Sequence, residues 1–240
     1  MASWAETIES GTGVTARGHS GAQTPGGATR APGGDAALQT VDLEQALPDA
    51  PRGTPLYVHL PFCKSKCHYC DFFSLPDEGQ DVEGMVEDML AEARLRAPQS
   101  PDTVFFGGGT PSLLSIASWK RLADGLEELT GFRASAREVT AEGNPESLDE
   151  PKAEALLRLG VPRLSIGFQS LRDDRLALFG RVHDTAASFR AFTAARAAGV
   201  ERVNIDMIYG LPEQRVAEWQ DELRRAPGPA PASFSALNLT

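Results

Sequence analysis

Basic residues are scarce in this chain of 240 residues, which carries 23 lysines and arginines against 33 aspartates and glutamates. The formal net charge of −10 argues against a nucleic-acid surface, which would be basic, and gives no reason to expect attraction to anionic lipid. Long hydrophobic runs are also missing, because no apolar stretch approaches the ~18 residues of a membrane-spanning helix. These absences leave a globular protein, long enough to bury a core of its own.

Export signals and cysteines are equally sparse. The start, "MASWAETIES", has no basic stretch followed by an apolar run, and acids such as Glu6, Glu9 and Asp42 disfavour a transit peptide. The chain has 3 cysteines, which cannot close two disulfides. We therefore predict a cytoplasmic location, where thiols stay reduced and clustered cysteines more often bind metal.

The composition changes near residue 54. Residues 1–53 are mostly glycine, alanine, proline, serine and threonine without a sustained apolar period, so we predict a disordered arm. From residue 54 to residue 240, apolar strand patterns alternate with helical spacings, and we interpret this part as one folded core. Six strands are expected, at "PLYVHL", "DTVFF", "REVTAEGN", "RLSIGF", "RVNIDMI" and "FSALNL".

Alternating strands and helices predict an α/β fold with parallel strands and helical crossovers. Periodicity alone does not choose between an open doubly wound sheet and a partial (β/α)6 barrel. The unusual polar and glycine-rich segments, however, follow the ends of five successive strands. In a barrel these ends share one rim, whereas an open sheet concentrates its site at one switch point. We therefore expect the barrel.

All cysteines fall in "PFCKSKCHYCDF", with the spacing C-x3-C-x2-C at Cys63, Cys67 and Cys70. Zinc would need a fourth ligand, such as His59 or His68, and structural zinc sites usually have a second cysteine pair, which this sequence lacks. A redox C-x2-C pair would leave Cys63 over. A four-iron cluster takes thiolate ligands, so three cysteines leave one iron open to a ligand with an amine and a carboxylate.

A glycine turn, "FFGGGTPS", follows the second strand. Three consecutive glycines after a buried strand let the backbone approach a ligand closely, because no Cβ intervenes. Exposed N–H and C=O groups there could bind an ammonium and a carboxylate.

Further polar residues stand at the later strand ends. Glu142 could accept both hydroxyls of a ribose or pair with an arginine. Gln169 and Asp206 end or interrupt buried strands and need partners, which a ligand or the backbone could supply. Arg181 could bind a carboxylate or phosphate, or form a surface ion pair.

The cysteine spacing after a first strand resembles the radical S-adenosylmethionine (SAM) superfamily. This resemblance implies a [4Fe-4S] cluster whose open iron is chelated by SAM, and a reduced cluster that cleaves SAM to a deoxyadenosyl radical. "YVHLPFCKSKCHYCDF", "FFGGGTPS", "EGNP", "SIGFQS", "FGRVH" and "NIDMIYGLP" together look like the oxygen-independent coproporphyrinogen III oxidase family, over residues 57 to about 213.

The resemblance implies a set of site residues. Cys63, Cys67 and Cys70 match the cluster ligands. Tyr69 resembles a residue that packs near adenine, with loop packing as the alternative. The residues that match the SAM pocket are Tyr57, Gly108, Gly109, Thr110, Glu142, Gln169, Arg181 and Asp206.

Two features separate the branches of this family. Phe72 stands where the oxidases have a further cysteine, and the glycine-rich arm does not resemble their substrate-contacting segment. Both favour the heme chaperone (HemW) branch, whose members bind heme and pass it to hemoproteins.

Two alternatives stay open. One is an oxidase that converts two porphyrinogen propionates to vinyls, and the other is a zinc-stabilised barrel without catalysis. The family continues beyond the point matching Thr240 into an accessory domain, so we expect a truncated chain. The partners expected are heme or porphyrinogen, together with a recipient hemoprotein or a reductant.

Overall fold

The computed structural model describes residues 51, 53–226 and 231–239. The arm predicted for residues 1–53 lies, for residues 1–50 and 52, outside the described part. Within the described residues, no helix is long and apolar enough to cross a membrane.

The main sheet has six parallel strands in the order β1-β4-β5-β6-β7-β8. Its strands are β1 (Leu56–Leu60), β4 (Thr103–Gly108), β5 (Glu138–Gly143), β6 (Arg163–Gln169), β7 (Arg202–Tyr209) and β8 (Ser233–Asn238). Each strand therefore lies beside its predecessor in the chain, which is barrel winding and not the reversed order of a doubly wound sheet. In the described residues β1 and β8 do not pair with each other, so the barrel is partial, and the predicted fold is confirmed.

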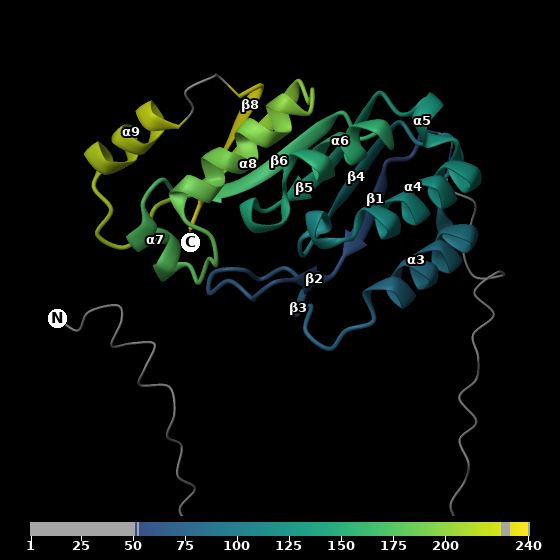
Figure 1. Ribbon diagram of the computed structural model, residues 1–240, viewed down its shortest axis with the longest axis horizontal. Coiled ribbons are helices and arrows are strands. Elements are labelled where there is room, and N and C mark those ends of the chain that lie inside the picture. The colour runs from purple at the N-terminus through teal and green to yellow at the C-terminus, as the bar shows by residue number, and fades with distance from the viewer. Residues whose placement is uncertain (1–50, 52, 227–230, 240) are drawn as a thin grey trace, which may run out of the picture. The chain divides into compact units, whose positions relative to one another are not determined.

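Helices connect the strands and lie along one face of the sheet (Figure 1). They are α3 (Val82–Arg96), α4 (Ile116–Thr130), α5 (Phe132–Ser135), α6 (Glu150–Arg158), α7 (Asp173–Leu178), α8 (Thr185–Ala197) and α9 (Val216–Arg225). The carboxylate of Asp149 accepts from the N–H of Lys152, and that of Asp184 accepts from the N–H of Ala187, so these two residues cap the starts of α6 and α8. The short α7 was not predicted, because one and a half turns carry little periodicity.

The two faces of the sheet differ in chemistry, since alternate residues of a strand point to opposite sides. The face under the helices is apolar and almost fully buried, and it includes Val104, Phe106, Val139, Ala141, Leu164, Ile166, Val203 and Ile205. On it, Phe106 meets the buried Trp119 of α4 edge to face, with ring centroids 5.0 Å apart. The opposite face carries Thr140, Glu142, Ser165, Asn204, Asp206 and Ser235, so the inside of the partial barrel is polar.

A buried carboxylate ties the last described helix to the end of β6. Glu222 of α9 is 2% exposed and accepts hydrogen bonds from the Ser170 hydroxyl and the Leu171 N–H, each at 2.6 Å. Ser170 and Leu171 directly follow the strand residue Gln169. The position of this strand end therefore depends on a contact between residues about 50 positions apart in the sequence.

Candidate functional site

A cavity opens at the carboxyl ends of the strands, where the polar face meets the cysteine loop. Most of the predicted site residues line it: Cys63, Cys67, Tyr69, Cys70, Gly108, Gly109, Thr110, Glu142, Gln169, Arg181 and Asp206. Tyr57 is the exception, because it lies on the edge strand β1, is 53% exposed and lines a different groove beside α3.

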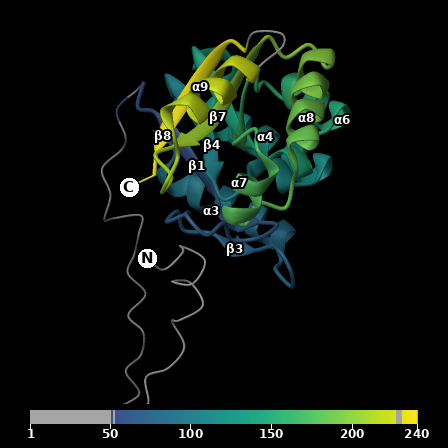
Figure 2. The same ribbon diagram turned by 90° about the vertical axis from the view of Figure 1, so that its left-hand side faces the viewer.

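The cysteine loop is held at its base and at its tip. At the base, the short strands β2 (Phe62–Cys63) and β3 (Leu75–Pro76) pair in parallel. At the tip, the backbone N–H of His68 donates to the Phe179 carbonyl at 3.0 Å, and the Tyr69 ring packs edge-on against Phe179 at 5.1 Å. Phe179 directly follows α7, which is labelled in Figure 2. The loop therefore spans from the first strand to the element after the fourth strand of the sheet.

Of the two histidines considered as zinc ligands, His59 has contacts at both ring nitrogens and His68 at one. His59 Nε2 lies 2.9 Å from the Phe73 carbonyl oxygen, and its Nδ1 lies 3.3 Å from the Tyr57 hydroxyl. His68 Nδ1 lies 3.0 Å from the Leu178 carbonyl oxygen. Across the described residues, no group of three or more histidine, cysteine, aspartate or glutamate side chains is arranged around one ion.

A single zinc ion and a four-iron cluster differ in how far apart they hold the cysteine sulfurs. A lone zinc needs every sulfur within about 2.3 Å of one centre. A cubane places each cysteine on a different iron and so keeps the sulfurs further apart. The three thiols line one cavity, as a cluster that takes one cysteine on each of three irons requires. Burial raises the pKa of the Cys63 thiol, so this thiol stays neutral more readily than a free one.

The glycine turn packs against residues 59–62, which lead into the cysteine loop. Gly108 has φ of +109°, and a Cβ on it would lie 2.7 Å from the His59 ring. A Cβ on Gly109 would lie 2.7 Å from the Phe62 carbonyl oxygen. The N–H groups of Gly109 and Thr110 donate to the carbonyls of Leu60 and Phe62, at 2.7 and 2.8 Å. These two donors are therefore not free for a ligand, and glycine is required there by the chain's own backbone.

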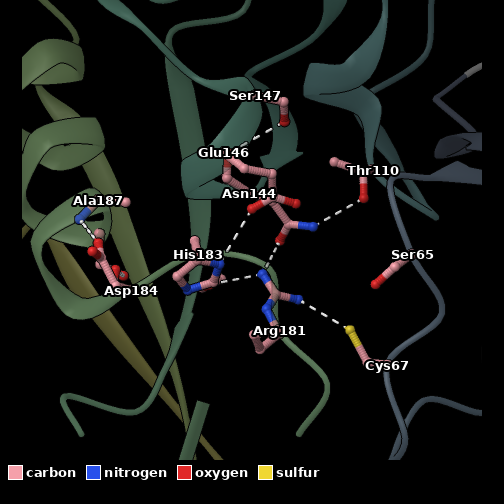
Figure 3. Close-up of polar contacts among 12 residues, drawn as sticks. Ser65, Cys67, Thr110, Asn144, Glu146, Ser147, Arg181, His183, Asp184 and Ala187 are labelled. Atoms are coloured by element: carbon pink, nitrogen blue, oxygen red, sulfur yellow. Dashed lines mark hydrogen bonds and ion pairs between the residues drawn. The ribbon is translucent and has the colours of Figure 1, made fainter. Parts of the chain in front are cut away.

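Three side chains from separate loops form a bridge between two of the thiols, and Figure 3 shows the part of it from Thr110 through Asn144 and Arg181 to Cys67. Thr110 Oγ1 donates to Cys63 Sγ at 3.5 Å, and Asn144 Nδ2 donates to Thr110 Oγ1 at 3.0 Å. Arg181 donates from Nη2 to Asn144 Oδ1 at 2.6 Å and from Nη1 to Cys67 Sγ at 3.4 Å. Asn144 was not predicted as a site residue, although it lies inside the quoted "EGNP" segment.

Behind Arg181, His183 lies beside the carboxylate of Glu146. His183 Nδ1 is 3.2 Å from a carboxylate oxygen of Glu146, and the His183 side chain is fully buried. Burial acts to raise the pKa of Glu146, but hydrogen bonding to His183 and the charge of Arg181 outweigh it and hold this pKa below its usual range. His183 is therefore buried and pairs with Glu146.

Two carboxylates share the inner face of the barrel. Asp206 accepts from Ser165 at 2.8 Å and from Asn204 at 2.7 Å. The pKa of Glu142 is raised to about 7, mainly by burial and to a smaller extent by the charge of Asp206. Glu142 is thus poised between its neutral and charged forms near neutral pH, whereas Asp206 has its own hydrogen-bond donors. Ser165, which sequence reasoning missed, lies opposite Asn204 on the neighbouring strand, and its role shows only in its hydrogen bond to Asp206.

The raised pKa predicts a pH-dependent stability. The folded state holds the Glu142 proton more tightly than the unfolded chain, so the contribution is present below pH 4.5 and is lost as pH rises through about 7. We expect Glu142→Gln to be more stable than the wild type by up to about 3 kcal/mol at pH 8, and by less at pH 5. Urea unfolding at the two pH values measures this difference. The exposed Glu201→Gln is the control, and an equal gain for Glu142→Gln at both pH values would contradict the prediction.

Gln169 combines backbone strain with an unpaired polar atom. Its φ is +65°, which is uncommon for a residue with a side chain, and it lies at an irregularity in the β6–β7 pairing. Its Oε1 is buried and has no hydrogen-bond partner among the described residues. Strain and an unpaired acceptor facing a cavity are typical of a ligand site.

The donor set of the cavity suits a cluster and a charged nucleotide. It offers three thiols, an unpaired amide oxygen and a carboxylate that can accept from a diol. These residues fit the groups implied by the resemblance. The backbone N–H groups of Gly109 and Thr110 do not fit the expectation that they bind a ligand, because they already donate to backbone carbonyls.

Comparisons with known proteins agree with this geometry. Residues 57–226 match the family described as the radical SAM superfamily. Heme chaperone HemW of Escherichia coli is 35% identical over 190 residues, which covers 77% of this chain and 50% of that protein. Radical S-adenosyl methionine domain-containing protein 1, mitochondrial, of Mus musculus is 40% identical over 175 residues, which covers 71% of this chain and 39% of that protein.

The solved structure of coproporphyrinogen III oxidase (HemN) from Escherichia coli, described as a radical SAM enzyme, has a TM-score of 0.71 and 29% identity. The match covers 82% of this chain and 46% of that one. The chain thus spans about half the length of the relatives that it matches. With a family match over residues 57–226, the chain belongs to the radical SAM superfamily, in the family that includes heme chaperone HemW and coproporphyrinogen III oxidase HemN.

Proposed function

We propose that this chain holds a [4Fe-4S] cluster on Cys63, Cys67 and Cys70 and SAM beside it. The observation that carries the proposal is that the three thiols line the same cavity as the glycine turn and the strand-end residues. Membership of the radical SAM superfamily supports both cofactors. When bound, the pair supplies one-electron chemistry, which the protein directs by positioning.

We assign the ligand contacts to the side chains that remain available. The Glu142 carboxylate accepts from the ribose hydroxyls, and its raised pKa makes this binding favour pH values above about 7, where it is charged. The unpaired Oε1 of Gln169 accepts a donor from the ligand. Tyr69 borders the cavity as a flat apolar wall for the base, although its ring also packs on Phe179.

For the whole protein we propose a heme chaperone. Several relatives that are 33–35% identical carry that name, and they come from different bacteria. Phe72, which is 67% exposed at the rim of the cavity, stands where the resemblance places a further cysteine in the oxidases. Binding of heme and its delivery to a recipient hemoprotein are proposals for a protein of which this chain matches about half. The cytoplasmic location also stays a prediction, and one relative is named as mitochondrial.

The second candidate is a porphyrinogen oxidase. The similarity to the solved oxidase structure, at a TM-score of 0.71, favours it. The reaction would convert two propionates of coproporphyrinogen III to vinyl groups.

The experiment reconstitutes the 240-residue chain anaerobically with iron and sulfide. We expect about four iron atoms per chain, a heme-dependent absorbance change on titration, and no protoporphyrinogen when coproporphyrinogen III, SAM and a reductant are supplied. Iron near zero, or zinc in its place, would overturn the cluster assignment. Protoporphyrinogen formation would favour the oxidase, and a cluster-loaded chain that leaves the heme spectrum unchanged would count against the chaperone.

A further inference from the structure

We propose that Thr110, Asn144 and Arg181 act together as a positioning bridge that raises the reduction potential of the cluster. The bridge joins Cys63 to Cys67 through four hydrogen bonds of 3.5, 3.0, 2.6 and 3.4 Å, and Figure 3 shows its part from Thr110 to Cys67. This inference rests on the proposed function, because it assumes that these thiols are cluster ligands.

The geometry of the bridge allows only one orientation of the Asn144 amide. A guanidinium can donate but not accept, so the atom that faces Arg181 must be Oδ1. The NH2 group then faces Thr110 Oγ1 and must donate to it. Since the threonine oxygen receives that hydrogen bond, its own proton is directed to Cys63 Sγ. Asn144 thus fixes the direction of both terminal donors, although it contacts neither thiol.

Arg181 is committed to the protein before any ligand arrives. Its Nη2 donates to the Gly167 carbonyl at 3.2 Å as well as to Asn144, and its Nη1 donates to Cys67 Sγ. A carboxylate on a ligand could still approach this cation. Its position, however, is set by strand ends and by Asn144, and the side chain is only partly exposed.

Donors to the sulfurs favour the reduced cluster. Reduction adds a negative charge, which delocalises onto the thiolates, and N–H or O–H groups and a guanidinium charge beside them stabilise it. In the described part of the chain, Cys70 has no side-chain hydrogen-bond donor recorded at its sulfur, so the stabilisation falls on Cys63 and Cys67 only. The bridge therefore makes the three protein ligands unequal.

The experiment compares cluster potentials without SAM, by electron paramagnetic resonance at defined potentials. In Arg181→Lys the single ammonium cannot serve Cys67, Asn144 and Gly167 together, and Asn144→Ala removes the connecting amide. At a fixed applied potential, we expect the ratio of reduced to oxidised cluster to fall about tenfold in Arg181→Lys, which equals 59 mV for a one-electron couple. Asn144→Ala should shift it in the same direction by less.

The control is Arg172→Lys, an arginine that pairs with Asp174 on the surface and should leave the potential unchanged. If the wild type holds a cluster and both bridge variants keep its potential, the bridge proposal is overturned while the proposed function stands. If the wild type holds no iron, the proposed function fails first. If the bridge variants lose the cluster, Thr110→Val decides, because it keeps the shape and removes the donor to Cys63, and an unchanged potential there overturns the proposal.

Discussion

The Cys67→Ala variant should retain almost no iron after anaerobic reconstitution, against about four iron atoms per wild-type chain. The chain has 3 cysteines in total, so no other thiol can replace the lost ligand. A four-iron cluster with two protein thiolates has two open irons and is exposed to solvent on both. Iron and acid-labile sulfide per chain, with absorbance of the cluster bands, measure the loss.

Ser65→Ala is the matched control, because Ser65 lies in the same loop and lines the same cavity without a thiol. Its hydroxyl donates to the Gly180 carbonyl at 3.4 Å, a long contact whose removal should leave iron retention unchanged. Equal iron in Cys67→Ala and the wild type would show that the metal is held elsewhere. Zinc bound to both proteins would support the alternative of a zinc site in which His59 or His68 is the fourth ligand.

The Glu222→Ala variant should lower the free energy of unfolding by about 3 kcal/mol. The truncation leaves the Ser170 hydroxyl and the Leu171 N–H buried without their acceptor, and an unsatisfied buried group costs about 1–3 kcal/mol. Because both groups follow Gln169, the strained end of β6 should loosen as well. Urea unfolding gives the stability, and hydrogen exchange at Leu171 reports the local effect.

Two controls locate the cause. Asp221→Ala removes an exposed carboxylate on the same helix, which pairs with Arg225 at 3.6 Å, and should cost less than about 0.5 kcal/mol. The Glu222→Gln variant keeps one acceptor oxygen, so its loss of stability should be larger than that of Asp221→Ala and smaller than that of Glu222→Ala. A loss as small in Glu222→Ala as in Asp221→Ala would mean that water replaces the carboxylate.

The features that could be predicted from the sequence are those determined by neighbouring residues. The strand–helix alternation, the caps at Asp149 and Asp184 and the cysteine spacing are each set within a few residues. A helix or strand is indicated by the spacing of its own apolar residues, and an N-cap by the residue type just before the helix. Family resemblance named twelve site residues, and eleven of them line one cavity of the structure.

The features that could not be predicted are pairings between distant segments. Asn144 joins Thr110 to Arg181 across 34 and 37 positions, and Glu222 meets Ser170 across 52. Nothing in the local pattern of these residues reveals their partners. The glycine turn shows the same limit, since three glycines indicate a close approach but not that Phe62, instead of a ligand, makes it.

The sequence by itself determined the order of strands and helices, the side of the sheet on which the apolar residues gather, and the cluster of thiols in one loop. Only the tertiary structure decided which donors are free, which carboxylate keeps its proton near neutral pH, and which thiols receive hydrogen bonds. The physical reason is that periodicity is a property of consecutive residues. Burial, charge proximity and hydrogen-bond pairing arise only when parallel strands bring their carboxyl ends to one rim.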